Sequence, residues 1–277
     1  MVPFKRGEHR RLIMTEVLES RLETILPNGR GVWIPMDHSA SSFPEQGLLD
    51  SDKAVDAVIE GGGDAIVMQK GPISHHFNRT SWGRFVCHAS LSTIHGGERS
   101  QDKVLVATPS EGLDRGAIAM SAQVNLGDPA EPEMIQRMAR ITTDSHEKSI
   151  PVLGMFYPRG GNLILDDSDS TSGVAHAARL AWELGCNVVK VPWTGSEESF
   201  EIVTSSVPIP VLVSGGPKDD DFGRVLELVE KSINAGGSGV CMGRNVFSSE
   251  DPASRIRALR AIVHDGANAE EASRHLR

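Results

Sequence analysis

Eight short apolar runs recur along the chain, and each is rich in Val, Ile, Leu, Met or Ala with little alternation between apolar and polar positions. Strands of a parallel sheet are buried on both faces and show this pattern, whereas half-exposed strands alternate. We therefore expect eight buried strands. They are residues 31–36, 64–69, 103–108, 117–124, 150–156, 187–191, 210–214 and 239–242.

Longer segments between these runs carry apolar residues at helical spacing. In residues 50–61, Ala54, Val55, Val58 and Ile59 form one stripe behind an Asp or Ser cap. Further helices are expected at 132–148, 172–184, 221–235 and 251–264.

Strands that alternate with helices in this way predict an α/β fold, a single (β/α)8 TIM barrel over residues 1–277. A leading helix, at about residues 10–26, is expected before the first strand. The rival fold is a doubly wound open sheet. It usually has a glycine-rich dinucleotide motif after an early strand, and the sequence lacks that motif.

The bulk composition narrows the class of protein. A chain of 277 residues with a formal net charge of −9 has the size of one barrel and repels nucleic acid. Its three cysteines lie in apolar runs, which indicates free thiols in a reducing compartment. No signal peptide and no apolar run of about 18 residues is visible, so we expect a cytoplasmic enzyme without membrane contacts.

A histidine-rich segment, residues 69–101, is difficult to assign. His75-His76 could be a pair of metal ligands. No carboxylate or cysteine lies near them at ligand spacing, so loop histidines close to a phosphate or at a subunit contact are the favoured interpretation.

Lys190 lies inside the apolar run 187–191 and is the sharpest chemical signal. A buried cation is costly, so burial should lower the pKa of this lysine and free its lone pair. A neutral amine attacks a ketone to form a Schiff base, which then acts as an electron sink. The alternative is an edge lysine whose stem reaches solvent.

Two other strand ends carry proton-transfer groups. Tyr157, the only tyrosine, ends the fifth predicted strand, and Asp37 ends the first. In a barrel these ends face the active site, where a phenol and a carboxylate can move protons. Packing of the tyrosine ring and capping by the aspartate are the structural alternatives. His38 either binds substrate or supports Asp37.

The last two strand ends carry glycine turns. Ser214, Gly215 and Gly216 follow the seventh strand, and Gly243 with Arg244 follows the eighth. In barrels these two loops commonly bind phosphate through backbone N–H groups, and an arginine adds a charged hydrogen bond. The sequence therefore predicts a phosphate site here, although turns need glycine for their own sake.

These residues together resemble the archaeal-type class I aldolases, which include fructose-bisphosphate aldolases and 2-amino-3,7-dideoxy-D-threo-hept-6-ulosonate synthases. The likeness runs in order from about residue 30 to about residue 270. The matching stretches are Pro35-Met36-Asp37-His38, Gly47-Leu48, Tyr157-Pro158-Arg159-Gly160, Ala178-Arg179, Glu183-Leu184-Gly185, Val189-Lys190, Pro210-Val211, Ser214-Gly215-Gly216-Pro217-Lys218, Gly243-Arg244-Asn245-Val246-Phe247, Asp251-Pro252 and Ile262-Val263-His264.

The resemblance implies a catalytic set of Asp37, Tyr157 and Lys190, and phosphate binding at the two glycine loops. It implies no metal, no cofactor and a ring-like homo-oligomer, often a decamer. The implied reaction makes or breaks a carbon–carbon bond of a phosphorylated ketose, as in carbohydrate metabolism. Dihydroxyacetone phosphate or a related ketose phosphate is the implied donor, and an aldehyde is the acceptor.

Three alternatives remain open. The acceptor could be aspartate semialdehyde, as in the heptulosonate synthases of aromatic amino acid biosynthesis and in a bacterial aminohydroxybenzoate branch. Departures from the family pattern at Ser39, residues 43–46 and Pro192-Trp193 fall at the barrel mouth and bear on this choice. A phosphosugar isomerase with Asp37 as a general base would need no covalent step. A non-catalytic sugar-phosphate-binding barrel would need no buried amine.

Overall fold

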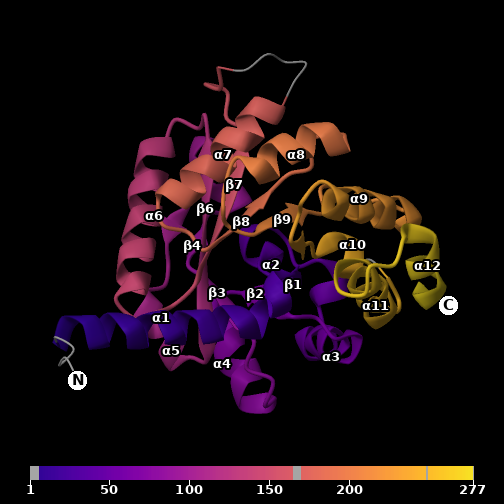
Figure 1. The fold of residues 1–277 in the computed structure, drawn as a ribbon, viewed down its shortest axis with the longest axis horizontal. Coiled ribbons are helices and arrows are strands. Elements are labelled where there is room, and N and C mark those ends of the chain that lie inside the picture. The colour runs from indigo at the N-terminus through magenta and orange to yellow at the C-terminus, as the bar shows by residue number, and fades with distance from the viewer. Residues whose placement is uncertain (1–5, 165–169, 248, 277) are drawn as a thin grey trace, which may run out of the picture.

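The computed structural model describes residues 6–164, 170–247 and 249–276, with side chains from Met14 onward. Eight parallel strands form a closed barrel, which confirms the predicted fold class (Figure 1). In barrel order they are β1 (Gly31–Pro35), β2 (Ala65–Met68), β3 (Phe85–His88), β6 (Ala117–Leu126), β7 (Val152–Pro158), β8 (Val188–Val191), β9 (Val211–Ser214) and β10 (Gly239–Cys241). The barrel closes where β1 pairs with β10.

One predicted strand is wrong. Residues 103–108 are not in the barrel, because β3 takes the third place between β2 and β6. Val104 and Leu105 instead form β5 (Val104–Leu105), which pairs antiparallel with β4 (Ser90–Leu91) outside the barrel. β3 has only four residues and ends in a histidine, so its apolar signal is short. The longer apolar run downstream is therefore the more prominent of the two.

Helices surround the barrel (Figure 1). Those that follow the strands or lie between them are α3 (Ser51–Gly61), α4 (Lys70–Arg79), α5 (Pro109–Asp114), α6 (Glu131–His146), α7 (Thr171–Glu183), α8 (Glu197–Ser205), α9 (Phe222–Asn234) and α11 (Pro252–Val263). Three of them begin at an aspartate whose side chain accepts a backbone N–H, as the sequence patterns indicate. The shorter helices are α2 (His38–Ser41), α10 (Arg244–Phe247) and α12 (Ala269–Ser273).

The helix α1 (Arg6–Ile25) precedes the barrel and runs along one end of it (Figure 1). Ile25 and Leu26 are buried against the barrel interior, and the indole of Trp33 donates a 2.6 Å hydrogen bond to the carbonyl of Ile25. This end is the one where β1 begins. The helix α1 therefore covers this end of the barrel. The active site is expected at the opposite end, where the strands finish.

Side chains alternate between the inside and the outside of the barrel along β7, β8 and β9. Val188, Leu153 and Leu212 belong to the cluster inside the barrel, whereas Val189 and Val191 pack outward against the helices. Because Lys190 alternates with Val189 and Val191, its side chain points into the barrel.

No helix in the described part of the chain combines the length and the apolar character that crossing a membrane requires.

Candidate active site

Lys190 is a buried lysine on the inner face of β8. Only 6% of the residue is exposed. It pairs in register with Met155 of β7 and Leu212 of β9, and its amine is hydrogen-bonded to the Tyr157 side chain. The alternative of an edge lysine that reaches solvent is therefore wrong, because β8 lies between two barrel strands.

Tyr157 comes from the end of β7, two residues beyond Met155 on the same face of the strand. The guanidinium carbon of Arg159 lies 4.7 Å from the centre of the phenol ring, in a cation–π contact that holds the ring in place. The phenol thus stands between Lys190 and the open mouth, where it can reach a substrate bound to the lysine.

Asp37 follows β1 and precedes α2. Its side chain makes no capping bond to α2 and is 16% exposed. One carboxylate oxygen lies 3.9 Å from Nε2 of His88, a buried histidine whose other ring nitrogen is 2.8 Å from the Ser121 hydroxyl. The structure brings Asp37, Tyr157 and Lys190 to one cavity, as the sequence predicts. His88 was not singled out, because its strand was not recognised.

The charges around Lys190 reverse one expectation. Burial works against the ammonium form, but Cys241, Tyr157 and Asp37 beside the amine outweigh burial and raise the pKa of Lys190. Burial does act to lower this pKa, as predicted, but the expected net lowering is wrong, because the prediction considered the strand without its neighbours. In the free enzyme the amine is a cation, and it must lose a proton before it attacks a carbonyl.

The groups around the amine differ in charge. Burial lowers the pKa of His88 to about 4 and also lowers the pKa of His38, so both rings are neutral near neutral pH. Burial opposes the Asp37 carboxylate, but His88, His38 and Lys190 together lower the pKa of Asp37. Lys190 is therefore an ammonium and Asp37 a carboxylate in the same cavity, and each charge favours the other.

His38 opens α2 and lines the cavity beside Gly243. Its Nδ1 atom is buried and has no hydrogen-bond partner among the described residues. Gly243 is required here, because a methyl group on it would lie 2.2 Å from the carbonyl oxygen of Pro35 and 3.0 Å from Cε1 of His38. His38 therefore borders the cavity as a neutral ring.

The two glycine loops meet at one side of the cavity mouth. Gly216 has a φ of 62°, the left-handed conformation that glycine adopts without strain, and Arg244 donates a 2.8 Å hydrogen bond to its carbonyl. Asn245 donates to the carbonyls of Gly215 and Pro217 at 2.7 and 3.2 Å, which ties the two loops together. Ser214, Gly215, Gly216, Gly243 and Arg244 all line the cavity.

Two further cations lie near each other at the cavity. Lys103 follows β3 in the chain and Arg159 follows β7, and both line the same cavity. Lys103 is 8% exposed; burial and the nearby charge of Arg159 lower the pKa of Lys103. Arg159 donates a 3.0 Å hydrogen bond to Asn125 on β6. The sequence assigned Lys103 to a strand, so its place at the mouth was missed.

The cavity is a single space of about 560 Å³. Lys190, Asp37 and Tyr157 line it together with the glycine loops, Arg244, Lys103 and Arg159. Such a cavity suits a molecule that carries a carbonyl and more than one anionic group.

Comparison with known proteins agrees with this geometry. A family model described as DeoC/LacD family aldolase matches residues 32–249. The 2-amino-4,5-dihydroxy-6-oxo-7-(phosphonooxy)heptanoate synthase of Streptomyces griseus is 36% identical over 236 residues, which cover 84% of each chain. The 2-amino-3,7-dideoxy-D-threo-hept-6-ulosonate synthase of Halobacterium salinarum is 34% identical over 254 residues, 91% of this chain and 94% of its own.

A solved archaeal fructose-1,6-bisphosphate aldolase, whose catalytic lysine is covalently bound to a carbinolamine intermediate, is similar in structure. Its TM-score is 0.79 at 27% identity, and the match covers 89% of this chain and 99% of the other. The family match spans most of the barrel. The matched segments cover 84%, 94% and 99% of the lengths of these three proteins. The protein therefore belongs to the DeoC/LacD family of aldolases.

Proposed function

We propose that the protein joins dihydroxyacetone phosphate to aspartate semialdehyde through a Schiff base on Lys190. The observation that carries the proposal is the position of this lysine. It is buried on the inner wall beside Asp37 and Tyr157, in one cavity with the cations Arg244, Lys103 and Arg159. A donor phosphate and an acceptor carboxylate can share these cations.

The product named for the Streptomyces griseus relative supports this pair of substrates. That product has a carboxylate at C1, an amino group at C2, a ketone at C6 and a phosphate on C7. An aldol bond joins the carbon next to the ketone to the former aldehyde carbon, here C5 to C4. Breaking it leaves dihydroxyacetone phosphate and aspartate semialdehyde.

The residues of this chain can perform each step. The Lys190 ammonium loses its proton to solvent, and the free amine adds to the donor ketone to give a carbinolamine. Loss of water forms an iminium, and loss of a proton from the adjacent hydroxymethyl carbon forms an enamine. The enamine carbon attacks the aldehyde, and Tyr157 donates its proton to the new alkoxide. Water then releases the product and restores the amine.

The donor phosphate is held by the glycine loops and Arg244. Replacing Arg244 with glutamine should raise the KM for dihydroxyacetone phosphate roughly 10–100-fold, because a charged hydrogen bond contributes about 1.5–3 kcal/mol. The kcat should change much less, since Arg244 does not reach the carbonyl. Steady-state kinetics would measure both constants. An unchanged KM would remove Arg244 from the phosphate site.

Acceptor choice is the test of the proposed function. Purified enzyme with dihydroxyacetone phosphate should use aspartate semialdehyde at least about tenfold better, in kcat/KM, than glyceraldehyde 3-phosphate. Lys103→Met should raise the KM for aspartate semialdehyde roughly tenfold or more, because it removes a cation from the carboxylate end. Lys231→Met, which removes an exposed lysine on α9, is the matched control.

A fructose-bisphosphate aldolase is the second candidate, and the similarity to the archaeal enzyme favours it. It predicts the reverse preference, for glyceraldehyde 3-phosphate. That result would reject the proposed acceptor and leave the Schiff-base chemistry untouched. The homo-oligomer and the cytoplasmic location that the resemblance implies stay predictions, and light scattering would test the first.

A further inference from the structure

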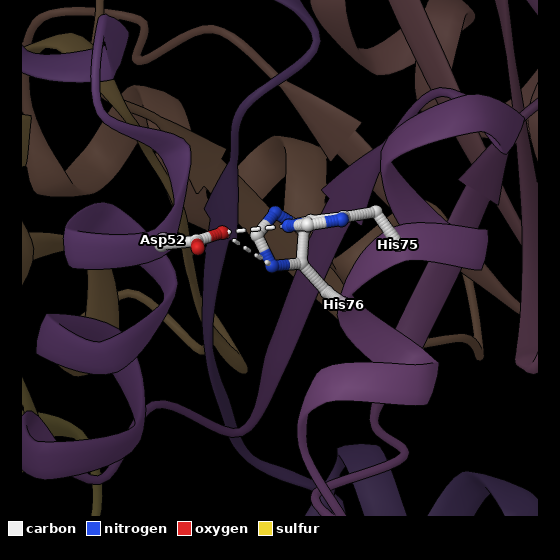
Figure 2. Close-up of side chains that lie close together, drawn as sticks. All are labelled: Asp52, His75 and His76. Atoms are coloured by element: carbon white, nitrogen blue, oxygen red, sulfur yellow. Dashed lines mark hydrogen bonds and ion pairs between the residues drawn. The ribbon is translucent and has the colours of Figure 1, made fainter.

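A group of three metal-ligand side chains lies on the helices outside the barrel, away from the catalytic cavity. Asp52 is in the first turn of α3, and His75 and His76 are consecutive residues of α4 (Figure 2). Their donor atoms all lie within 4.8 Å of one another. No carboxylate stands near the histidines in the sequence, but the fold brings Asp52 to them from 23 residues upstream. The predicted loop at His75-His76 is therefore wrong, because these residues are helical.

We propose that Asp52, His75 and His76 bind a divalent transition-metal cation, with zinc as the best fit, and that the ion clamps α3 to α4. Imidazole nitrogens and a carboxylate oxygen are the donors that zinc prefers, at about 2.0–2.2 Å from the ion. Three such ligands leave a fourth, tetrahedral position for water.

Two of the three donor-atom separations bracket the value that this coordination needs, and the third, between the two rings, is at most 4.8 Å. Oδ1 of Asp52 lies 2.8 Å from Nε2 of His75 and 3.7 Å from Nδ1 of His76. Neighbouring ligands of a tetrahedral zinc ion are about 3.3–3.5 Å apart, given the bond lengths above. The two observed separations lie on either side of that value. A small rotation of the exposed His75 and Asp52 side chains would equalise them.

His76 is held ready for this role. Its side chain is completely buried, and its ring stacks on Phe85 with the ring centres 6.5 Å apart. Nε2 is buried without a hydrogen-bond partner among the described residues, while Nδ1 faces Asp52.

Arg79 competes with the ion for the same atoms. Its guanidinium lies 3.4 Å from Oδ1 of Asp52 and 3.5 Å from Nδ1 of His76. Its shortest ion pair, 2.8 Å, is to Asp56. Arg79 therefore keeps a carboxylate partner when the ion takes Asp52. Without an ion the arginine holds the cluster together, and replacing it should strengthen metal binding.

A calorimetric titration with zinc chloride tests the proposal. It uses the purified, chelator-treated full-length protein. We expect one saturable site per chain. His75→Ala should weaken it at least about tenfold, whereas Arg79→Gln should strengthen it several-fold. His75 is 59% exposed, so its removal should leave folding and aldolase activity intact. His176→Ala, which removes an exposed histidine on α7, should leave the affinity unchanged.

Cobalt chloride gives a second readout. A tetrahedral site with nitrogen ligands produces visible absorption bands that octahedral aqueous cobalt lacks, and these bands should disappear in His75→Ala. Bound metal should also raise the thermal midpoint of the wild type and leave that of His75→Ala unchanged. Equal zinc affinity in the wild type and His75→Ala, or no saturable binding in either, would overturn the proposal.

Discussion

Replacing Lys190 with methionine is expected to abolish aldol turnover, with kcat lower by at least about 10⁴-fold. The thioether has a similar length and no nucleophilic nitrogen, so neither carbinolamine nor iminium can form. Because methionine is apolar and the site is buried, the barrel should retain its fold, which circular dichroism and thermal unfolding would verify.

Borohydride reduction in the presence of dihydroxyacetone phosphate supplies the direct measurement. The wild type should gain the mass of one reduced adduct at Lys190, and Lys190→Met should gain none. The rate of trapping should rise with pH through the neutral range, because the raised pKa keeps the amine largely protonated there. A falling or flat profile would contradict a Lys190 amine that is largely protonated near neutral pH.

The same variant separates the other mechanisms. An isomerase that uses Asp37 as a general base would retain turnover after Lys190→Met, because no bond to the lysine is made. A non-catalytic barrel would bind the sugar phosphate and form no carbon–carbon bond in the wild type. Membership of the aldolase family stands against both alternatives. The trapped adduct would assign the covalent step to one residue.

Local sequence pattern predicted most of the barrel. Seven of the barrel strands coincide with predicted apolar runs, since strands that are buried on both faces need apolar side chains throughout. Lys190 was recognisable because it interrupts such a run. Asp37 and Tyr157 were recognisable because the end of a barrel strand faces the active site. In these cases a few neighbouring residues in the sequence are enough to make the prediction.

What the sequence did not reveal depends on contacts between distant segments. Lys103 reaches the mouth because the preceding residue, Asp102, is paired with Arg99 and with Arg137 of α6. Arg137 also donates a 3.0 Å hydrogen bond to the carbonyl of Lys103. None of these partners can be inferred from spacing. The pKa of Lys190 was misjudged for the same reason, because its acidic neighbours come from other strands.

Replacing Tyr157 with phenylalanine is expected to lower kcat roughly 10²–10⁴-fold, the usual contribution of a positioned proton donor. The ring remains, so its cation–π contact with Arg159 and the packing at the end of β7 are kept. The KM for dihydroxyacetone phosphate should stay close to that of the wild type, since the glycine loops after β9 and β10 are unchanged.

Tyr157→Phe is informative because the reaction should stop at a defined step. The Lys190 amine is still present beside Asp37, so borohydride should still trap the donor, and the adduct should appear without turnover. Tyr157 is the only tyrosine in the chain, so the ultraviolet change on its ionisation in the wild type reports this one phenol. Near-normal turnover in the variant would show that another group protonates the alkoxide. Loss of trapping would instead place the phenol in imine formation, where its hydrogen bond to Lys190 lies.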